Sequence, residues 1–337
     1  MKILSLVNNA SGCDYHRVRL PITYLQQAGY IQGVPAGLSF EDSMKECDIL
    51  FYNRLPYNTS LDQILDFRKK YGFKIIVDLD DYWKLYPGHL LEGIWKAQKL
   101  EQHILRNVSV ADAVICTSDR LYQKILPYNG NVHVVPNGLP FDDDQFIPRQ
   151  SQHEDNAYVY VGGGSHYWDL RLLESTMRKL ARHNFTNQVV LAGVAEDAEV
   201  YRKMGNMLGA SGQLSGFRTV QHLPVSSYMD LYEHGTIALA PLIANEFNAH
   251  KSNLKVLEAG CKSMPIIVSN TGPYLDDVCP FLMRADKASD FYRWIQWCED
   301  NPNHVADNGA ALAAYVRQNY DIRILNYLRL DAFKSVL

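Results

Sequence analysis

Three charged residues in one short stretch, Lys251, Lys255 and Glu258, are spaced at i, i+4 and i+7. At this spacing they share one face of an α-helix. Most of the residues around them are apolar, and the apolar run 265–268 follows, so the sequence predicts a largely buried helix. Charges in such a helix are costly unless something pairs with them. The stretch therefore predicts either a ligand site or an internally salt-bridged helix, and by itself it favours neither.

The chemistry of this stretch suits a sugar nucleotide. Free N–H groups at a helix start, together with the ammonium groups of Lys251 and Lys255, favour a phosphate. The carboxylate of Glu258, two turns further on, can accept hydrogen bonds from two vicinal hydroxyl groups. We therefore expect a diphosphate at the helix start and a ribose on Glu258. Further donor-binding candidates adjoin the helix start: His250, Ser252 and Asn253.

The first turn of the chain also carries candidate residues. Gly12 would let the backbone approach a ligand closely. Arg17 lies in the first turn of a predicted helix, where a cation is unfavourable unless an anion offsets it. An anion-binding Arg17 is therefore one interpretation, and an ordinary surface arginine is the other.

A predicted strand at 74–79 runs directly into two carboxylates, Asp80 and Asp81. Such a pair can hydrogen-bond sugar hydroxyls, act as a base or hold a cation. Tyr82 and Trp83 follow and can stack on a sugar ring, so we interpret the turn as a substrate site. The alternative is an acidic helix cap beside aromatic residues.

Three successive glycines at 162–164 open the second half of the chain. The turn lacks the Lys-Ser/Thr of a P-loop and the third glycine of the dinucleotide fingerprint. Backbone N–H groups of Gly163, Gly164 and Ser165 can still cradle a phosphate, and His166 can donate to a diphosphate oxygen. A tight interdomain turn is the alternative for the glycines.

Phe217 and Arg218 follow a predicted strand at 213–214. Phe217 can stack on a nucleobase, or it can simply belong to the hydrophobic core. By itself this pair is a weak indication of a ligand site.

Length and composition indicate a globular protein of two domains. The 337 residues are too many for one ordinary core, and 47% are hydrophobic. The net charge of −4 argues against nucleic-acid binding through overall charge, although not against a local basic groove. Six scattered cysteines without a Cys-x-x-Cys pair are interpreted as reduced thiols of a cytoplasmic protein, in the host cytoplasm if a phage encodes it. The apolar runs are too short for a signal peptide or a membrane span, and no metal-ligand spacing is present.

Short apolar runs alternate with amphipathic ones along the chain, which predicts α/β architecture with doubly wound parallel sheets. The polar, aperiodic stretch 141–156 is predicted to link two halves. We expect one domain of residues 1–140 and another of residues 157–315. Ligands of such sheets bind outside the carboxyl ends of the strands, so the turns described above form the predicted site.

Taken together, these turns resemble those of GT-B glycosyltransferases, in particular the large retaining family often called glycosyl transferases group 1. The resemblance covers nearly the whole chain, and the chain is similar to a subgroup with a Gly-Ser-x-x-His turn and a Phe-Asn-x-x-Lys-Ser segment. These segments carry the resemblance: Val135-Pro136-Asn137-Gly138, Gly162-Gly163-Gly164-Ser165-His166, Asp169-Leu170, Ala240-Pro241-Leu242, Phe247-Asn248, Lys251-Ser252, Lys255, Glu258-Ala259-Gly260, Pro265 and Ser269.

The resemblance implies two Rossmann-like domains that face each other across a cleft. The N-terminal domain would hold the acceptor and the C-terminal domain the nucleotide-sugar donor. It further implies that Glu258 holds the donor ribose, that Lys251 or Lys255 neutralises the diphosphate, and that residues 216–218 border the nucleobase. The last helix, at about 320–337, would return to the first domain.

Two departures from the family pattern affect the predicted site. Typical members have a second glutamate eight residues before the ribose glutamate, and this chain has His250 there, which puts donor-sugar contacts at that point in doubt. The usual Gly-Arg and Lys-Gly pair of the first turn in the C-terminal domain is absent. Because that pair is missing, we expect His166 and Lys251 to contact the phosphates instead. In this family retention is usually attributed to front-face attack, with the leaving diphosphate helping to deprotonate the acceptor. Such a mechanism requires neither a nucleophilic carboxylate nor a metal ion.

The sequence therefore predicts a retaining glycosyltransferase that uses a UDP- or GDP-sugar, no further cofactor and no metal. The expected acceptor is a saccharide or a lipid-linked glycan. The catalytic candidates are Asp80, Asp81, His166, Lys251 and Lys255. The donor-binding candidates are Gly12, Arg17, Gly163, Gly164, Ser165, Phe217, Arg218, His250, Ser252, Asn253 and Glu258.

Two alternative functions stay open at this point. One is a phage-type glycosyltransferase that modifies a hydroxymethylated DNA base. It would need a local basic face, for which the candidates are Lys69, Lys70, Arg106, Arg120 and Lys124. The other is a non-catalytic or epimerase-like protein that binds sugar nucleotides, from which donor turnover would distinguish a transferase.

Overall fold

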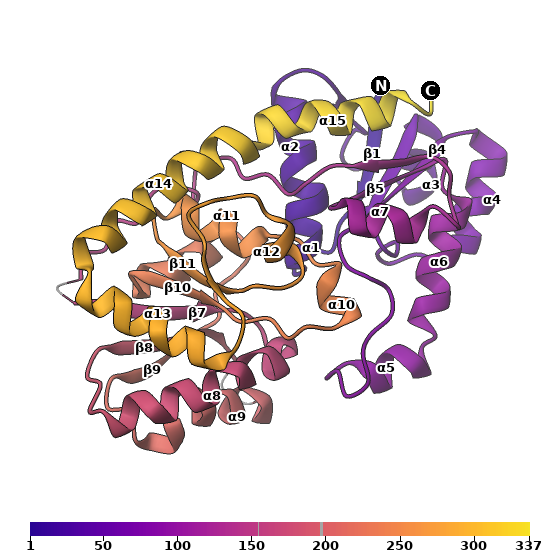
Figure 1. Cartoon of the computed structure of the whole chain (residues 1–337). Helices are drawn as coiled ribbons and strands as arrows, with labels where there is room; N and C mark the ends of the chain where they lie inside the picture. Colours follow the sequence, from indigo (N-terminus) through magenta and orange to yellow (C-terminus); the bar gives the residue numbers. More distant parts are fainter. Residues whose placement is uncertain (154, 196–197) are drawn as a thin grey trace.

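The computed structural model describes residues 1–153, 155–195 and 198–337. Residue 154 of the expected linker and residues 196–197 of the second half lie outside the described residues. Two six-stranded sheets, flanked by helices, make up most of the chain (Figure 1). Every strand pairing in both sheets is parallel. This is the predicted α/β architecture of two doubly wound sheets.

The first sheet has the strand order β2-β1-β3-β4-β5-β6. Its strands are short apolar runs, and all five residues of β3 are buried, as in sheets covered by helices on both faces. The helix α4 shows why the intervening segments are helical, because Ser60 caps its first turn and Gly72 ends it at φ 82°. The strands are β1 (Lys2–Leu6), β2 (Gln32–Gly33), β3 (Ile49–Asn53), β4 (Lys74–Leu79), β5 (Ala113–Cys116) and β6 (Val132–Val134). The helices are α1 (Gly12–Asp14), a π-helical turn (Tyr15–Arg19), α2 (Leu20–Gln27), α3 (Phe40–Glu46), α4 (Leu61–Tyr71), α5 (Glu92–Ala97), α6 (Leu100–Val110) and α7 (Asp119–Ile125).

The second sheet has the strand order β12-β11-β10-β7-β8-β9. Its strands are β7 (Ala157–Val161), β8 (Gln188–Val194), β9 (Phe217–Gln221), β10 (Ile237–Ala240), β11 (Ile266–Ser269) and β12 (Met283–Ala285). The α-helices are α8 (Tyr167–Arg182), α9 (Glu199–Leu208), α10 (Glu246–Ala249), α11 (Leu254–Cys261), α12 (Pro273–Asp276), α13 (Ala288–Asp300), α14 (Pro302–Tyr320) and α15 (Ile322–Lys334). Three 3₁₀ turns cover Gly164–His166, Ala210–Gly212 and Tyr228–His234.

Each sheet has one point where the strand order reverses. In the first sheet β1 lies between β2 and β3, and in the second sheet β7 lies between β8 and β10. Such a switch point leaves a crevice at the carboxyl ends of the strands, where ligands of α/β sheets bind. The segments that leave these ends are therefore the ones that position a site. They are the turns after β1 and β3 in the first sheet and those after β7 and β10 in the second.

Three expected elements differ from the structure. The charged stretch is not one helix, because α10 ends at Ala249 and α11 begins at Leu254. Lys251 therefore lies in the connecting segment and does not share a helical face with Lys255. The strand expected at 213–214 begins later, at Phe217. The stretch 91–107, whose amphipathic pattern predicts a single helix, is divided into α5 and α6 at Lys99, whose φ is 51°.

The C-terminal helices connect the two halves. The helix α14 packs against α11, while α15 packs against α2, β5 and β6 of the first half (Figure 1). Backbone hydrogen bonds between Leu139 and residues 320–322 hold the junction of these two helices. On the buried face of α15, Phe333 makes an edge-on ring contact with Phe51 of β3, with ring centroids 5.1 Å apart. The division into domains of residues 1–140 with 320–337 and of residues 157–315 stays a prediction.

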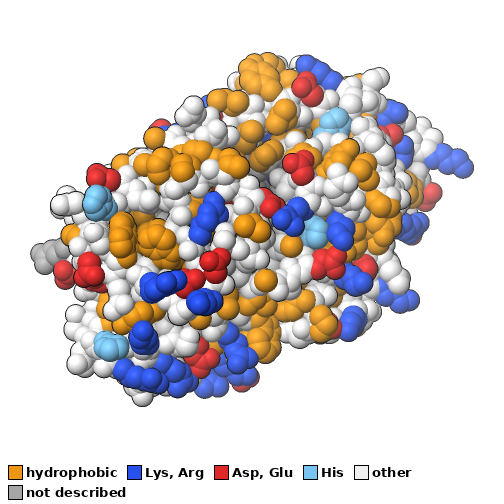
Figure 2. Space-filling model, in the orientation of Figure 1, with side chains coloured by type: hydrophobic (Ala, Val, Ile, Leu, Met, Phe, Trp, Pro, Cys, Tyr) orange, Lys and Arg blue, Asp and Glu red, His pale blue; other side chains and the backbone are white. Residues whose placement is uncertain are grey.

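Charged side chains of both signs are distributed over the surface, as Figure 2 shows for one face. All six cysteines are described, and all are free thiols. Within the described parts of the chain, no helix is both long enough and apolar enough to cross a membrane.

The packing of α15 gives a first testable prediction. Phe333→Ala should lower the free energy of unfolding by about 3–5 kcal/mol, because it removes a large, fully buried ring from a packed interior. Urea-induced unfolding measures the effect. The matched control is Ile324→Ala on the same helix, whose side chain is 61% exposed and should change stability little. Equal effects of the two variants would mean that α15 does not stabilise the first half in this way.

Candidate functional site

A cavity of about 450 Å³ lies between the two halves and is lined by residues of both. Its volume is within the range of about 300–1,000 Å³ that is typical of ligand sites. Its walls come mainly from the segments after β1, β7 and β10, beside the two switch points, with further residues from the segments after β4, β6 and β9. The predicted candidates among its lining residues are Gly12, Arg17, Asp80, Gly163, Ser165, His166, Ser252 and Glu258.

A second cavity of about 200 Å³ adjoins the first. Both are lined by Cys13, Ser165 and His166, so these three residues mark where the cavities meet. The predicted candidates Asp81 and Lys251 lie in the smaller cavity. Its other walls are largely apolar or aromatic: Leu85, Tyr86, His89, Leu91, Trp95 and Phe247. Walls that combine aromatic faces with charged groups complement a sugar ring, which has apolar C–H faces and polar hydroxyls.

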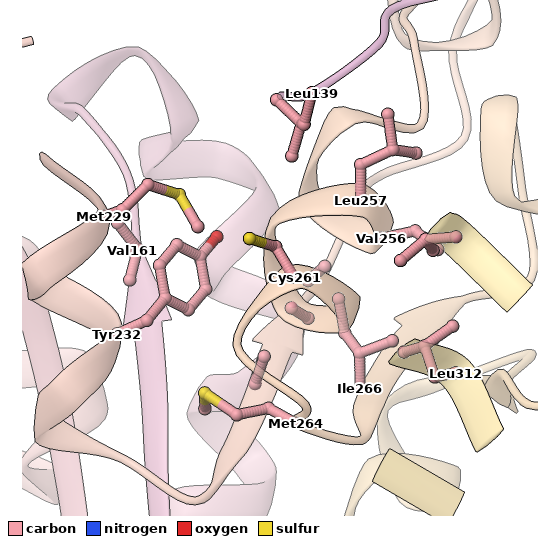
Figure 3. Close-up of a cluster of buried hydrophobic side chains, with 14 of the residues drawn as sticks. Leu139, Val161, Met229, Tyr232, Val256, Leu257, Cys261, Met264, Ile266 and Leu312 are labelled. Atoms are coloured by element: carbon pink, nitrogen blue, oxygen red, sulfur yellow. The ribbon is translucent and has the colours of Figure 1, made fainter. Parts of the chain in front are cut away.

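The position of Glu258 depends on the burial of α11, which Figure 3 shows among apolar side chains of neighbouring elements. Val256, Leu257 and Cys261 of this helix are fully buried. The helix also lies very close to α14, because a Cβ atom on Gly260 would come within 2.6 Å of a methyl group of Val316. A glycine is therefore required at the contact, and α11 is held firmly beside the cavity.

Glu258 is 4% exposed, and both of its carboxylate oxygens accept hydrogen bonds from tyrosines. Tyr228 donates to Oε1 at 2.9 Å, and Tyr232 donates to Oε2 at 2.7 Å. Burial, together with the adjacent carboxylate, raises the pKa of both tyrosine hydroxyls well above the ordinary value, so both keep their protons. A carboxylate has about four lone-pair sites, so Glu258 retains capacity for a ligand diol.

The two lysines occupy different places. Lys255 donates to the carbonyl oxygen of Val161, at the end of β7 and directly before the glycine turn. Burial lowers the pKa of Lys255, and Glu258 partly opposes this effect. Lys251 reaches across to the first half, where its Nζ lies 3.5 Å from Asp81 Oδ1, and its ammonium also lies 4.6 Å from the ring centroid of Phe247. Lys251 therefore borders the smaller cavity, while Lys255 is held at the glycine turn.

The glycine turn after β7 is closely packed. A Cβ atom on Gly164 would lie 2.8 Å from a methyl group of Val200, and the Gly164 N–H donates to the hydroxyl of Tyr201 at 3.1 Å. Only part of the turn is therefore free to contact a ligand. Gly163 and Ser165, on either side of Gly164, line the larger cavity.

His166 forms a pair with Asp169, one helical turn further on. Nδ1 of His166 lies 2.8 Å from Oδ2 of Asp169. The other oxygen, Oδ1, accepts the N–H of Ile243 and the side-chain amide of Asn248, both at 2.9 Å. Burial lowers the pKa of His166 below its ordinary value, although the hydrogen bond to Asp169 acts in the opposite direction. Near neutral pH the ring is therefore uncharged.

The carboxylates after β4 belong to an ion-pair cluster centred on Arg54, a residue that the sequence analysis missed. Nε of Arg54 lies 2.8 Å from Asp80 Oδ1, and its NH2 group lies 3.5 Å from Asp81 Oδ2. Burial by itself would raise the pKa of Asp80, but Arg54, with hydrogen bonds from Cys13 and Asn53, holds it well below the ordinary value. Asp80 is therefore a fixed anion. The signal for Arg54 was its place two residues after the apolar run 49–52, a pattern that predicts a buried strand.

Arg17 lines the larger cavity. However, the anion that offsets its charge is a protein side chain and not a ligand. Its guanidinium bonds to both carboxylate oxygens of Asp78, at 2.8 and 2.9 Å. Two further hydrogen bonds go to the side chain of Asn137 and the carbonyl of Val135. The side chains of Arg17 and Asp78 are 1% and 0% exposed, which indicates a structural ion pair.

Several predicted residues are not brought to the two cavities. His250 stacks on Tyr82 at 4.7 Å and donates from Nδ1 to the Glu246 carbonyl, while Asn253 bonds to Asp277 and Tyr320. Tyr82 and Trp83 are buried, so neither offers the expected stacking face. Phe217 packs into the core. Phe217 and Arg218 begin β9, at the opposite end of the strand from the cavities, because the strand starts later than expected.

A histidine in the first turn joins the site without having been predicted. His16 lies in the π-helical turn and lines the larger cavity. It is 7% exposed, and its Nδ1 has no hydrogen-bond partner among the described residues. Burial lowers the pKa of His16 to about 4, so the ring is neutral. In the sequence, the candidates Gly12 and Arg17 of the same turn were the features that could have pointed to His16.

The proposed basic face is largely neutralised by acidic partners. Lys124 pairs with Glu246 at 2.6 Å and Arg120 pairs with Asp276, and both pairs connect the two halves. Within the first half, Arg106 pairs with Asp62 and Lys70 pairs with Glu41. These pairings argue against a continuous positive surface for DNA.

Neither a family model nor a curated protein matches the sequence. Solved structures do match. A glycosyltransferase from Rickettsia africae has a TM-score of 0.67 and 11% identity, over 99% of this chain and 98% of that chain. Sucrose-phosphate synthase from Thermosynechococcus elongatus has a TM-score of 0.65 and 14% identity, over 100% and 99%. HepE from Anabaena in complex with UDP-glucose has a TM-score of 0.65 and 14% identity, over 100% of both chains.

The fold is GT-B. The similarity extends over the whole length of these chains and includes both sheets. It confirms the fold class that the sequence predicted. At 11–14% identity the similarity concerns the fold alone.

The Arg17–Asp78 pair gives a second prediction. Arg17→Met should lower the free energy of unfolding by about 3–5 kcal/mol, because the buried carboxylate of Asp78 would lose its ion-pair partner and keep only the side-chain amide of Asn53 at 3.3 Å. The double variant Arg17→Met/Asp78→Leu should recover much of this loss, since it removes both charges. Urea-induced unfolding of the two variants and of the single Asp78→Leu variant measures the coupling. If Arg17→Met kept full stability and only weakened nucleotide binding, Arg17 would be a ligand contact instead.

Proposed function

We propose that the protein is a glycosyltransferase that moves a sugar from a nucleotide-sugar donor to an acceptor hydroxyl, with retention of anomeric configuration. The observation that carries the proposal is Glu258. It is a buried carboxylate, held by two tyrosines at the wall of a 450 Å³ cavity between the halves of a GT-B fold. The Anabaena protein HepE, which shares the fold, has been solved with UDP and with UDP-glucose, which supports a uridine diphosphate sugar as the donor here, and a guanosine diphosphate sugar is the alternative.

The donor would be bound mainly by the second half of the chain. Glu258 would accept hydrogen bonds from the ribose diol. The diphosphate would lie at the glycine turn, where Gly163 and Ser165 line the cavity and Lys255 supplies positive charge. Lys251 would neutralise charge that develops on the phosphate as the glycosidic bond breaks, which is the moment when electrostatic stabilisation accelerates a reaction.

The acceptor would be bound mainly by the first half. The smaller cavity offers the carboxylate of Asp81, the guanidinium of Arg54 and the aromatic rings of Tyr86 and Trp95. These groups suit a saccharide or a lipid-linked glycan. We further assign residues 1–140 with 320–337 to an acceptor domain and residues 157–315 to a donor domain. A cytoplasmic location is in keeping with the six free cysteines.

The two alternative functions have less support. A transferase acting on DNA would need a positive surface, and most of the candidate side chains for one are paired with acids. A non-catalytic or epimerase-like protein would bind a sugar nucleotide without transferring the sugar. A turnover assay therefore separates this alternative from a transferase.

A nucleotide screen followed by a turnover assay tests the proposal. A nucleoside diphosphate present at a hundred times its Kd should stabilise the protein by about 2.7 kcal/mol, measured as a thermal shift. The matching sugar nucleotide should then be hydrolysed or consumed, and NMR of the transferred sugar should show the anomeric configuration of the donor. The proposal fails if neither uridine nor guanosine diphosphate stabilises the protein. Retention alone fails if the product has the opposite configuration.

The different roles of Glu258 and Lys255 give a third prediction. Glu258→Gln should weaken nucleoside, monophosphate and diphosphate to the same extent, by about ten- to a hundredfold, because all three contain the ribose. Lys255→Ala should weaken the diphosphate far more than the nucleoside, since its partner is the phosphate charge. Affinities at two salt concentrations provide the measurement, and high salt should reduce the lysine contribution more. Equal losses for all three ligands in both variants would show that α11 has only a structural role.

Metal independence is a fourth prediction. It rests on the ammonium group of Lys255 at the glycine turn and on that of Lys251 in the adjoining cavity. Donor turnover should therefore continue in the presence of EDTA. Loss of turnover in EDTA and its recovery with Mg²⁺ or Mn²⁺ would instead make Asp80 and Asp81 metal ligands.

A further inference from the structure

We propose that the acceptor is a saccharide of at least two sugar units, and that its second unit binds in a third cavity, on the first half of the chain. This inference rests on the proposed function and extends its acceptor site. The third cavity has a volume of about 350 Å³. It is lined by the segments after β1 and β3 and by the helices α5 and α6.

The third cavity lies at the switch point of the first sheet. In a sheet with this strand order the switch point is between β1 and β3, and ligands bind outside the carboxyl ends of these two strands. The segment after β1 lines the cavity with Asn8 and Asp14, and the segment after β3 lines it with Tyr57 and Asn58. The cavity therefore occupies the place where the topology of the first sheet favours a ligand.

The third cavity continues from the smaller cavity, because Cys13, Arg54 and Trp95 line both. The indole N–H of Trp95 donates to the carbonyl oxygen of Trp83 at 2.8 Å, which fixes the orientation of a ring that both cavities share. The smaller cavity alone, at about 200 Å³, is below the range of about 300–1,000 Å³ that is typical of ligand sites. Together the two cavities fall within that range, so they form one acceptor groove with room beyond the first sugar unit.

The walls of the third cavity combine aromatic faces with uncharged hydrogen-bonding groups. Tyr57 is 44% exposed, and Trp95 is half-buried. Among the described residues, neither the hydroxyl of Tyr57 nor the side-chain amide of Asn58 has a hydrogen-bond partner. Both groups can donate and accept, as the hydroxyls of a sugar do. An aromatic face can pack on the apolar C–H face of a sugar ring, so these walls suit a saccharide.

The charges around the third cavity argue against a phosphate in this place. Among the described lining residues Arg54 is the only cation, and its guanidinium is already paired with Asp80 and Asp81. Asp14 adds a carboxylate to the same walls. A phosphate removed from water is costly unless cations or N–H groups compensate its charge. The walls therefore favour an uncharged sugar unit over the phosphate of a lipid carrier.

The turn after β3 has a backbone conformation that is common at ligand sites. Arg54 and Asn58 both have left-handed backbone, with φ of 51° and 57°. This conformation is unfavourable for residues with a side chain, and it persists where the surrounding structure holds it, often at binding sites. Here the ion pair between Arg54 and Asp80 holds one end of the turn. A turn that is already ordered loses little conformational freedom when a ligand binds.

Saturation-transfer NMR tests the binding without any turnover. The probes are glucose, galactose, mannose and N-acetylglucosamine, and the disaccharides maltose, lactose, mannobiose and chitobiose. At least one disaccharide should bind about tenfold more tightly than its monosaccharides, since it reaches a second set of contacts. Saturation should reach both of its rings. The inference is wrong if no disaccharide binds more tightly than its monosaccharides, or if only one ring receives saturation.

Two variants test the third cavity itself. Tyr57→Ala removes an exposed ring, and Asn58→Gly removes the amide while it keeps the left-handed backbone accessible, so both variants should fold. Each should lower the ratio of kcat/KM for the disaccharide to kcat/KM for the monosaccharide by about tenfold, because only the disaccharide reaches this cavity. The matched control is Tyr30→Ala. Tyr30 is also 44% exposed but lines none of the three cavities, and its variant should keep the wild-type ratio.

The outcomes distinguish this inference from the proposed function. If no sugar nucleotide is consumed, the proposed function fails, and the inference fails with it. If the donor is consumed but a monosaccharide is as good an acceptor as every disaccharide, only the inference is wrong. It is also wrong, while the transferase stands, if a lipid phosphate without sugar units is the preferred acceptor. A preference for the disaccharide that Tyr57→Ala and Asn58→Gly abolish and Tyr30→Ala keeps would establish the second sugar site.

Discussion

The buried ion pair between Arg17 and Asp78 organises the first half of the chain around the cleft. Arg17 comes from the turn after β1 and Asp78 from β4, and both side chains are almost completely shielded from water. Such a pair is tolerable only when every polar atom has a partner. Asn137 and Val135 supply these partners to the guanidinium, and the amide of Asn137 also donates to Ser252 of the second half at 2.8 Å. One buried charge pair thus positions the first turn, β4 and the contact between the halves.

A further buried charged residue lies beside this pair, on the C-terminal helix. Arg329 of α15 is buried near Arg17 and Asp78, and it donates to Asn326 on its own helix at 2.7 Å. Burial, reinforced by the like charge of Arg17, lowers the pKa of Arg329 to about 9, while Asp78 acts in the opposite direction. A charge is costly in this place unless the surrounding structure stabilises it. The contact between α15 and the first sheet therefore includes a buried cation as well as apolar packing.

Contacts across the cleft combine weak ion pairs with short-range packing. The pairs Lys124–Glu246 and Arg120–Asp276 are about half exposed, and exposed pairs of this kind contribute little to stability. The stacking of Tyr82 on His250 and the bond from Asn137 to Ser252 involve mostly buried groups. His250 occupies the position of an expected sugar-contacting glutamate, and here it packs the two halves together. The relative position of the two halves therefore depends more on these buried contacts than on the exposed charges.

The sequence by itself determined the two α/β halves and ten of the 26 described residues that line the larger and the smaller cavity. Apolar periodicity and turn chemistry are local properties, and the carboxyl ends of parallel strands meet at one edge of a sheet. Only the tertiary structure decided what each polar atom does. Asn137, which completes the bonding of Arg17, is 120 residues away, and Asn248, which orients Asp169, is 79 residues away. Lys251 lies outside the helix and Phe217 begins its strand, since tertiary packing sets element boundaries within a few residues. The hydrogen bonds that Asp169 accepts from Ile243 and Asn248 join distant segments, which no local pattern encodes.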